Sequence, residues 1–503
     1  MKVSFLFCLA IFWIADCSDI HAQIYGSNTF EFQYGNLPFE EDTDLTTSYD
    51  LLNLYYDQGN ISAYGRFEQF LTPHESRNYF KLTQKRLQYE DDHFEVKVGN
   101  FYKTIGRGLL LRSYEIPGSV YEDNFYRTRY AFNRDQEGIS LGYSSDHIEI
   151  VALHAKPLFN PLPPNFEPDS LRRPDLVEAI EASIILTKDL TVGGAYMRSS
   201  SDTDANSYRE FGSFILNANL PFQLQLYSEY AFETDVSLFG FNPEDSYALY
   251  TGLNYYYGSF GLSAEYKNYN SFKIGSGFND PPSLIKEHTY PVLNRSTHVL
   301  NTSNETGFQV EAFYHFEGGH SLTANVTAAR NEVFNVNHYR EYFVEGLYQY
   351  NEFLSVKSFI DYAIDELKQE DNRWSLGLIT EKSFNHEWSL TADLQYQTYK
   401  QTSFAQQSEN YYGAISFSMF PSLTISAIAE ASTDLLLTDN PRTFEVEENT
   451  RSWFGGNIRY KINYTHTLDI FAGQRRGGPA CTSGICYEIL DFEGVEIRFS
   501  TRF

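Results

Sequence analysis

The sequence ends in a stretch whose side chains alternate in polarity. From Gly494 to Phe503 it reads Gly-Val-Glu-Ile-Arg-Phe-Ser-Thr-Arg-Phe. Successive side chains of a strand point to opposite faces, so this stretch has one apolar face and one face with three charges. The apolar face holds Val495, Ile497, Phe499, Thr501 and Phe503, and the other face holds Glu496, Arg498, Ser500 and Arg502. The pattern predicts a strand with one side in a nonpolar environment.

The same period of two recurs along the chain. Leu390, Ala392, Leu394 and Tyr396 oppose Thr391, Asp393, Gln395 and Gln397. Similar amphipathic segments begin with Ile24–Tyr34 and continue at 48–57, 61–70, 79–89 and 92–103. Aromatic residues make up 17% of the chain, and they favour strands. Repeated amphipathic segments of about ten residues, rich in aromatics, are typical of a transmembrane β-barrel.

The connections between these segments alternate between tight and long. Tight connections are predicted at Asp189, Pro221, Gly258, Gly318, 385–386, 421–422 and Asn463, and long ones at 156–176, 200–208, 233–245, 271–304, 400–408 and 434–448. We therefore predict an all-β fold: a transmembrane, antiparallel, up-and-down β-barrel with no plug domain and with both ends on the periplasmic side. The first strand pairs with the last. The wall has 24 strands if residues 105–134 stay out of it, and 26 if they add a hairpin.

The beginning of the chain has the features of a secretory signal peptide. Met1-Lys2 precedes an apolar run from Val3 to Ile14, and Ala22 supplies the small residue before a cleavage site. We predict a signal peptide at 1–22 and the barrel at 23–503. A lipid anchor on Cys17 is disfavoured, because Asp16 stands where that processing needs a small residue. Together with the strand pattern, this predicts a location in the bacterial outer membrane.

The net charge of −28 excludes nucleic acid as a partner, since no basic stripe offsets it. Acidic outer loops could contact the divalent cations that bridge lipopolysaccharide phosphates. A solvated acidic surface without a partner is the simpler interpretation. We predict contact with outer-membrane lipid and lipopolysaccharide. The sequence identifies no protein partner for the folded barrel, and it predicts no cofactor.

Four arginines and two glycines form the first candidate site. Glycine lets the backbone approach closely at Gly106 and Gly108, while Arg107, Arg112, Arg127 and Arg129 concentrate positive charge. One interpretation is a constriction of the lumen that binds an anionic solute. The other, slightly favoured, is that these arginines pair with lumenal carboxylates and brace a wide barrel, because buried charges must be paired.

The connection at 271–304 is the second candidate. A connection of this length either enters the lumen or covers it. It contains Glu287, His288 and His298, which are metal-ligand types without the close spacing of a metal motif. We therefore predict that the two histidines lie on the loop surface and that the chain has no metal site.

Three stretches carry a resemblance to a known family. These are GNFYKTIGRGLLLRSYE at 99–115, NDPPSLIKEHTYPVLNRSTHVLN at 279–301 and GGPACTSGICYEILDFEGVEIRF at 477–499. The chain resembles an uncharacterised family of large outer-membrane β-barrels of Bacteroidetes-type bacteria. The terminal aromatic also resembles the assembly signal of such barrels, which implies that the barrel assembly machinery recognises the last strand through Phe503. The resemblance implies the fold and location but no mechanism.

Catalytic motifs give little support to an enzyme. Gly138-Ile139-Ser140-Leu141-Gly142 matches G-x-S-x-G, but it continues an alternating strand where that motif needs a strand-to-helix elbow. We predict a non-enzymatic, porin-like passive channel for a polar solute, with anions among the candidates. The alternatives are a structural or docking barrel of a machine that secretes proteins or exports surface polymers and, disfavoured, an outer-membrane hydrolase.

Cys481 and Cys486 are the two cysteines that remain after removal of the signal peptide, and we predict a disulfide between them on the outer side of the barrel. A metal pair is disfavoured because two further ligands are missing nearby. The bond should lower the intact mass of the unreduced protein by two hydrogen atoms. In a non-reducing digest, Cys481 and Cys486 should remain cross-linked to each other. A short loop limits its contribution to stability to about 2 kcal/mol. Free thiols that react quantitatively with an alkylating reagent would contradict it.

Overall fold

The computed structural model describes most of the chain from Gln23 to Phe503. The described residues are 23–37, 45–158, 163–164, 175–201, 204–234, 246–272, 274, 278–279, 281–298, 304–333, 335–403, 406–438, 450–482 and 485–503. The predicted signal peptide lies outside them. In the described residues, no helix is both long and apolar enough to cross a membrane.

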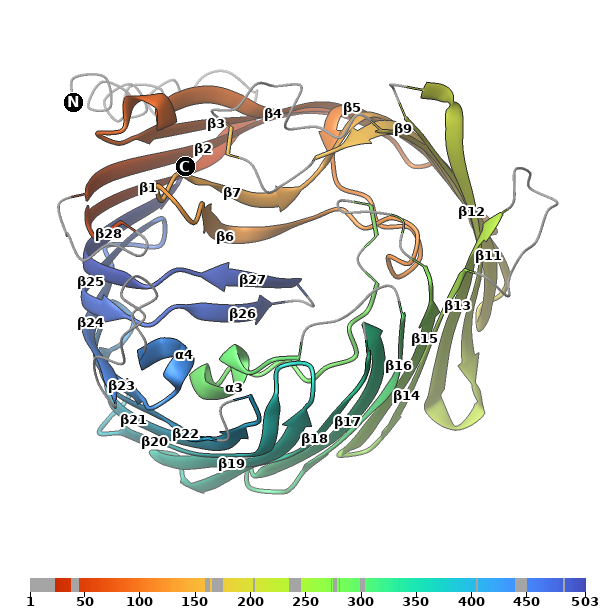
Figure 1. Ribbon diagram of the computed structural model, residues 1–503. Coiled ribbons are helices and arrows are strands. Elements are labelled where there is room, and N and C mark those ends of the chain that lie inside the picture. The colour runs from red at the N-terminus through yellow and green to blue at the C-terminus, as the bar shows by residue number, and fades with distance from the viewer. Residues whose placement is uncertain are drawn as a thin grey trace.

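A single antiparallel sheet of 24 strands closes on itself to form the wall (Figure 1). Its strands are β1 (Gln23–Gly35), β2 (Leu45–Gln58), β3 (Ile61–Leu71), β4 (Tyr79–Glu90), β5 (Phe94–Phe101), β8 (Gln136–Ser144), β9 (Ile148–Pro157), β10 (Asp175–Thr187), β11 (Leu190–Ser201), β12 (Asp204–Leu220), β13 (Leu224–Thr234), β14 (Tyr247–Tyr257), β15 (Phe260–Asn270), β16 (Asn304–His315), β17 (Ser321–Val333), β18 (Asn335–Asn351), β19 (Leu354–Asp365), β20 (Glu370–Ser383), β21 (Trp388–Gln401), β22 (Gln406–Met419), β23 (Leu423–Ser432), β24 (Arg451–Lys461), β25 (His466–Arg475) and β28 (Phe492–Arg502). The predicted barrel is confirmed, and residues 105–134 stay out of its wall.

The barrel closes where β1 pairs with β28. The register runs from Ser27 opposite Arg502 to Gly35 opposite Gly494. β2 occupies the other edge of β1, and β25 occupies the other edge of β28. Every strand edge at this seam is therefore paired, so no row of backbone amides is left open to lipid.

Polarity across the wall is inverted relative to a soluble protein. On β20 and β21, the outward side chains of Trp374, Leu376 and Leu394 are 46%, 47% and 59% exposed. The intervening, inward-facing Arg373 and Gln397 are each 1% exposed. This distribution is typical of a barrel wall with lipid outside and a polar lumen inside.

Aromatic side chains lie near both rims of the outer face. The rings of Trp388 and Phe417 are 5.1 Å apart, close to the turns before β21 and β23. Toward the opposite rim, the rings of Tyr362 and Trp374 are 4.7 Å apart. Aromatic girdles of this kind flank the apolar band of membrane barrels.

The two rims differ in their connections. β1 begins and β28 ends at the rim with the predicted tight turns, such as residues 258–259. At the opposite rim, 271–303 is long as predicted, but two other connections are shorter than predicted. β12 begins at Asp204 directly after the end of β11 at Ser201, and β22 begins at Gln406 after the end of β21 at Gln401. Strand pairing reaches Ser201 opposite Asp204 and Gln401 opposite Gln406, because backbone hydrogen bonds do not depend on an apolar side chain.

Two hairpins and a short helix lie inside the ring of wall strands (Figure 1). The elements outside the wall sheet are β6 (Tyr114–Glu122), β7 (Arg129–Arg134), β26 (Gly478–Thr482), β27 (Ile485–Ile489), α3 (Pro291–Arg295), α4 (Leu435–Thr438) and the 3-10 turns η1 (Glu75–Arg77) and η2 (Pro221–Gln223). The β6–β7 hairpin leaves the wall after β5, the α3 segment after β15 and the β26–β27 hairpin after β25. All three insertions start at the rim opposite the termini.

The β26–β27 hairpin carries the two cysteines between the last two wall strands and starts at the rim opposite the termini. It points into the lumen, where Ile485 packs with Tyr114, Ile116 and Phe132 of the β6–β7 hairpin (Figure 1). Apolar side chains on both hairpins explain why they pair inside instead of extending outward. The backbone register sets Cys481 opposite Cys486, but both side chains lie outside the described part of the structure, so the disulfide stays a prediction.

The seam depends on a glycine. Gly494 has a φ of 147°, and a Cβ built on it would lie 2.1 Å from the carbonyl oxygen of Tyr34 on β1. We predict that Gly494→Ala destabilises the closed barrel by about 1–3 kcal/mol, through strain and lost pairing. The measurement is the temperature at which the compact, heat-modifiable band converts to the unfolded band in electrophoresis.

Gly346→Ala is the matched control for this variant. A Cβ at Gly346, on β18, meets no heavy atom within 4 Å. Its conversion temperature should stay at the wild-type value. Equal stability of both variants would contradict the assigned role of Gly494.

Candidate functional site

Buried ion pairs join the β6–β7 hairpin to the seam of the barrel. Arg129, on β7, contacts Glu31 of β1 at 2.5 Å, Glu122 of β6 at 2.7 Å and Glu496 of β28 at 2.9 Å. The Arg129 side chain is 4% exposed and that of Glu31 is fully buried. Arg498 of β28 also contacts Glu31. One guanidinium group thus bridges the first and last wall strands on their lumenal side.

Arg127, in the turn between β6 and β7, is fully buried and adds a second anchor. Its guanidinium donates to Glu122 at 2.9 Å and to the carbonyl oxygen of Asn36 at 2.6 Å, and it contacts the carbonyl oxygen of Asp491. Burial opposes ionisation of Glu122, but Arg129 and Arg127 outweigh it and hold the pKa of this carboxyl below its usual value. Ion pairs of Arg127 and Arg129 therefore hold the β6–β7 hairpin against the seam.

The segment 102–113, which leads into β6, is held differently. Ile105, Leu109, Leu110 and Leu111 are at most 1% exposed. They pack with wall residues that include Val177, Met197, Phe211 and Tyr269. This sector of the lumenal wall is apolar, so burial of hydrophobic surface fixes the segment.

Two glycines let the backbone of this segment approach wall carboxylates. Gly106 and Gly108 have φ values of 56° and 91°. A Cβ on Gly106 would lie 2.4 Å from the carboxylate of Glu229 on β13. The amide of Gly106 donates to Glu181 at 3.2 Å, and that of Arg107 donates to Glu229 at 2.7 Å. The close approach explains why glycine stands at position 106.

The arginines of the first candidate site fall into two groups. The exposed Arg107 lies over the ring of Tyr227 at 4.8 Å, and the partly buried Arg112 lies over Tyr114 at 5.8 Å. Arg127 and Arg129 are instead buried in ion pairs. The structure thus places all four on lumenal segments without bringing them into one cluster.

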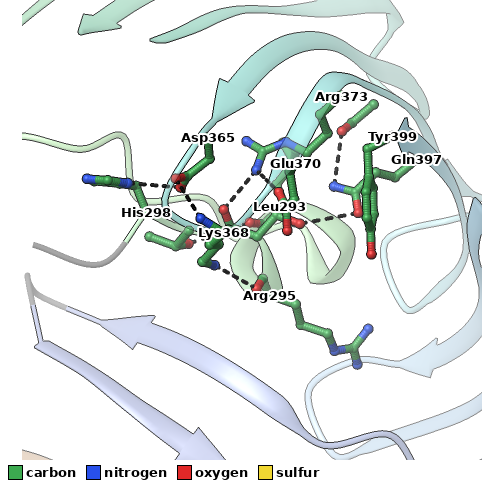
Figure 2. Close-up of polar contacts among 12 residues, drawn as sticks. Leu293, Arg295, His298, Asp365, Lys368, Glu370, Arg373, Gln397 and Tyr399 are labelled. Carbon is green, nitrogen blue, oxygen red and sulfur yellow. Dashed lines mark hydrogen bonds and ion pairs between the residues drawn. The ribbon is translucent and has the colours of Figure 1, made fainter. Parts of the chain in front are cut away.

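The segment 281–298, which contains α3, packs on the lumenal face of the wall (Figure 2). His298 Nδ1 lies 2.9 Å from Asp365 Oδ2, and Arg373 donates to the carbonyl oxygen of Ser296 at 2.9 Å. Burial opposes protonation of His298, but hydrogen bonds and charge from Asp365 and Glu305 raise its pKa above the usual value. The hydrogen bond to Asp365 therefore makes His298 an anchor of the segment.

Further polar contacts hold the same segment along its length. They are Lys267 with Ser283, Lys286 with Glu311, Tyr290 with Glu345, Arg295 with Glu430, and Gln397 with Val292. The prediction that His288 and His298 lie on the loop surface is wrong, because they are 5% and 2% exposed. The polar lumen supplies carboxylates to both histidines, and this draws them inward.

The acidic partners of these anchors could not be predicted from the sequence. Glu31, Glu122 and Glu341 carried no motif, and only the alternation on β28 placed Glu496 on the polar face. A charge on the polar face of an alternating strand is the signal that was available. It identifies a lumenal group but not its partner.

The G-x-S-x-G stretch has no catalytic geometry in the described structure. Ser140 lies within β8, opposite Lys97 of β5 and Leu153 of β9. A strand paired on both edges cannot form the exposed elbow that the motif requires. The arrangement of the site suits bracing and narrowing of a lumen.

Arg129 should be essential to the seam. We predict that Arg129→Gln destabilises the barrel by about 1.5–3 kcal/mol, because it removes charged hydrogen bonds and leaves Glu31, Glu122 and Glu496 with one arginine each. The same electrophoretic conversion temperature measures it. Arg107→Gln, which removes an exposed arginine, should leave that temperature unchanged. A small effect of Arg129→Gln would show that the bridge is not a brace.

Comparison with solved structures finds proteins of similar fold and low sequence identity. OccK5 (OpdH) of Pseudomonas aeruginosa matches with a TM-score of 0.39 and 13% identity, covering 68% of this chain and 93% of that one. OccK3 (OpdO) of the same organism gives 0.41 and 14%, covering 69% and 92%. The translocation pore of the P pilus usher PapC gives 0.49 and 8%, covering 95% and 99%.

Sequence comparison assigns the chain to a family. No curated protein sequence matches it significantly. The Family of unknown function (DUF6029) matches residues 1–116 and 177–416, well over half of the 503 residues. The match does not test the expected origin in Bacteroidetes-type bacteria. The chain belongs to the family of unknown function DUF6029.

Proposed function

We propose that this protein spans the bacterial outer membrane and passes small polar solutes through a lumen narrowed by its own inserted segments. The inverted polarity of the wall is the observation that carries the proposal. Leu376 and Leu394 are exposed on the outside, while charged and amide groups such as Arg373 and Gln397 are buried inside. A lipid bilayer outside and a polar lumen inside satisfy both sets.

Closure of the sheet supports the membrane location. Within a bilayer every backbone amide and carbonyl needs a partner inside the protein, and among sheets only a closed barrel supplies one. Here β28 completes the ring, and the amide of Phe503 still donates to the carbonyl oxygen of Gly26 at 3.1 Å. The secretory signal peptide predicted at 1–22 agrees with this location, because it would direct the chain out of the cytoplasm.

The proposed selectivity depends on Arg107. Arg127 and Arg129 are consumed in buried ion pairs and leave no free positive charge for a solute. Arg107 is exposed on a segment that lies against the lumenal face of β13. The proposed preference for anions is assigned to this guanidinium.

The proposed partners follow from the two rims and the last strand. Arg330 with Glu332, and His338 with Glu366, form exposed pairs 2.9 and 3.0 Å apart near the rim opposite the termini. Such mixed charges fit lipopolysaccharide headgroups and their bridging cations. The amphipathic β28 is the proposed recognition element for the barrel assembly machinery.

The inserted segments also favour a second candidate function. Three insertions occupy part of the lumen, as expected for a structural or docking barrel that conducts nothing (Figure 1). Conductance separates the two functions.

We predict that the purified protein forms discrete conductance steps in planar bilayers. Arg107→Gln should shift the reversal potential in a salt gradient toward cation selectivity, because it removes an exposed lumenal positive charge. Replacing β26–β27 by a short Gly-Ser linker should raise the unit conductance, since the hairpin occupies lumenal space.

Arg330→Gln is the control for the charge effect. It removes an exposed arginine whose position on β17 points away from the lumen, and it should leave selectivity unchanged. Absence of conductance in the wild type and in the hairpin variant, both verified as folded, would sink the channel and leave the docking barrel.

A further inference from the structure

Three ligand-type side chains meet at the point where the α3 segment contacts the wall. His288 comes from the segment, Glu341 from β18 and Asp361 from β19. One ligating atom of each lies within 4.8 Å of the other two. All three residues are buried, with exposures of 5%, 1% and 0%. Two adjacent wall strands and an inserted segment therefore converge on one point.

The distances suit a shared metal ion. Bonds from a divalent metal to imidazole nitrogen or carboxylate oxygen are about 2.0–2.2 Å, so two ligand atoms of one ion lie up to about 4.4 Å apart. His288 Nε2 and Glu341 Oε1 are 3.2 Å apart, within that limit. Movement of side chains by a few tenths of an ångström brings the widest pair within it.

The local charges are unbalanced without a cation. Arg373 lies 3.3 Å from Glu341, 3.7 Å from Asp361 and 2.9 Å from Glu370. One guanidinium group thus faces three carboxylates. Even with Lys368 acting on Glu370 and His288 lying 3.2 Å from Glu341, Asp361 has only a share of Arg373 as its counter-charge. A buried, unpaired carboxylate is strongly unfavourable.

Hydrogen bonding leaves the same groups incomplete. Among the described residues, His288 Nδ1, Glu341 Oε2 and Asp361 Oδ2 are buried and have no hydrogen-bond partner. Buried polar atoms in native structures are nearly always satisfied. The unpartnered atoms belong to the three residues that the geometry brings together, which indicates a missing ligand with positive charge.

We propose that His288, Glu341 and Asp361 form a site for a divalent transition-metal cation, with zinc and manganese as the candidates. One imidazole and two carboxylates suit these ions, whereas magnesium and calcium prefer ligand sets made of oxygen alone. Arg373 acts as an outer positioning residue, because it contacts Glu341 Oε1 and Asp361 Oδ1 and so orients both carboxylates.

The proposed ion links the inserted segment to the wall. His288 belongs to the segment, while Glu341 and Asp361 belong to neighbouring strands. A bound metal is therefore a cross-link that holds the α3 segment in the lumen. This inference does not depend on whether the barrel conducts, because it concerns only the binding site and the segment that it fixes.

The test uses the full-length protein in detergent, stripped with a chelator. Titration calorimetry with zinc chloride and with manganese chloride should show one binding site for at least one of the two metals. His288→Gln and Asp361→Asn should each weaken that affinity by at least about tenfold, because ligand loss costs no less than loss of an outer partner. Each variant is first checked for the compact band of the folded barrel.

His298→Gln is the matched control. It also removes a buried imidazole that pairs with wall carboxylates from the same segment, but His298 is outside the three-residue cluster. Its metal affinity should stay within about twofold of the wild type, which is within ordinary context effects. Equal loss in His298→Gln and His288→Gln would overturn the assignment, since it would report loss of segment order instead of a ligand.

X-ray absorption of the metal-loaded wild type keeps the test independent of variant folding. The proposal expects a first shell of nitrogen and oxygen atoms with imidazole scattering. A spectrum without imidazole overturns it. Absence of binding by the folded wild type at about 1 mM metal, an affinity weaker than about 4 kcal/mol, also overturns it and assigns the charge balance to protons instead.

Discussion

Pairing of the first wall strand with the last is the interaction on which the rest of this structure depends. An open edge in a bilayer would leave a row of amides and carbonyls unsatisfied, each at a cost of several kcal/mol. The β1–β28 register removes that edge. Arg129 reinforces it from inside by contacting Glu31 on one strand and Glu496 on the other. The hairpin that carries Arg129 is thus part of the closure as well as of the lumen.

Closure with 24 strands creates a further problem, because a ring of this size is too wide for its wall side chains to fill. The chain fills part of the space with insertions, held in two ways. Leu109 and its neighbours use an apolar sector of the lumenal wall. The α3 segment uses charges, such as His298 with Asp365 and Arg295 with Glu430. A charged lumen allows both, provided that every buried charge finds a partner.

The alternation of polar and apolar side chains predicted most of the fold but little of the site. It predicted that β28 has Glu496 and Arg498 on one face, and both contact lumenal groups. It could not predict that Arg129 pairs with residues 98 and 367 positions away, because such pairs depend on barrel closure. His288 shows the same limit. Its ligand-type neighbours lie on β18 and β19, so no spacing in the sequence revealed the cluster.

The positions of the anchors also decide which insertion can move while the barrel stays closed. Release of the β6–β7 hairpin would take Arg129 away from Glu31 and Glu496 at the seam, so movement of the hairpin and closure of the wall are energetically linked. The α3 segment is anchored on β15 to β23, away from the seam in the order of strands. Its anchors include histidines and carboxylates, whose bonds respond to protons and metal ions. A change in lumenal width that spares the wall is therefore expected from the α3 segment, and the hairpin is expected to remain fixed.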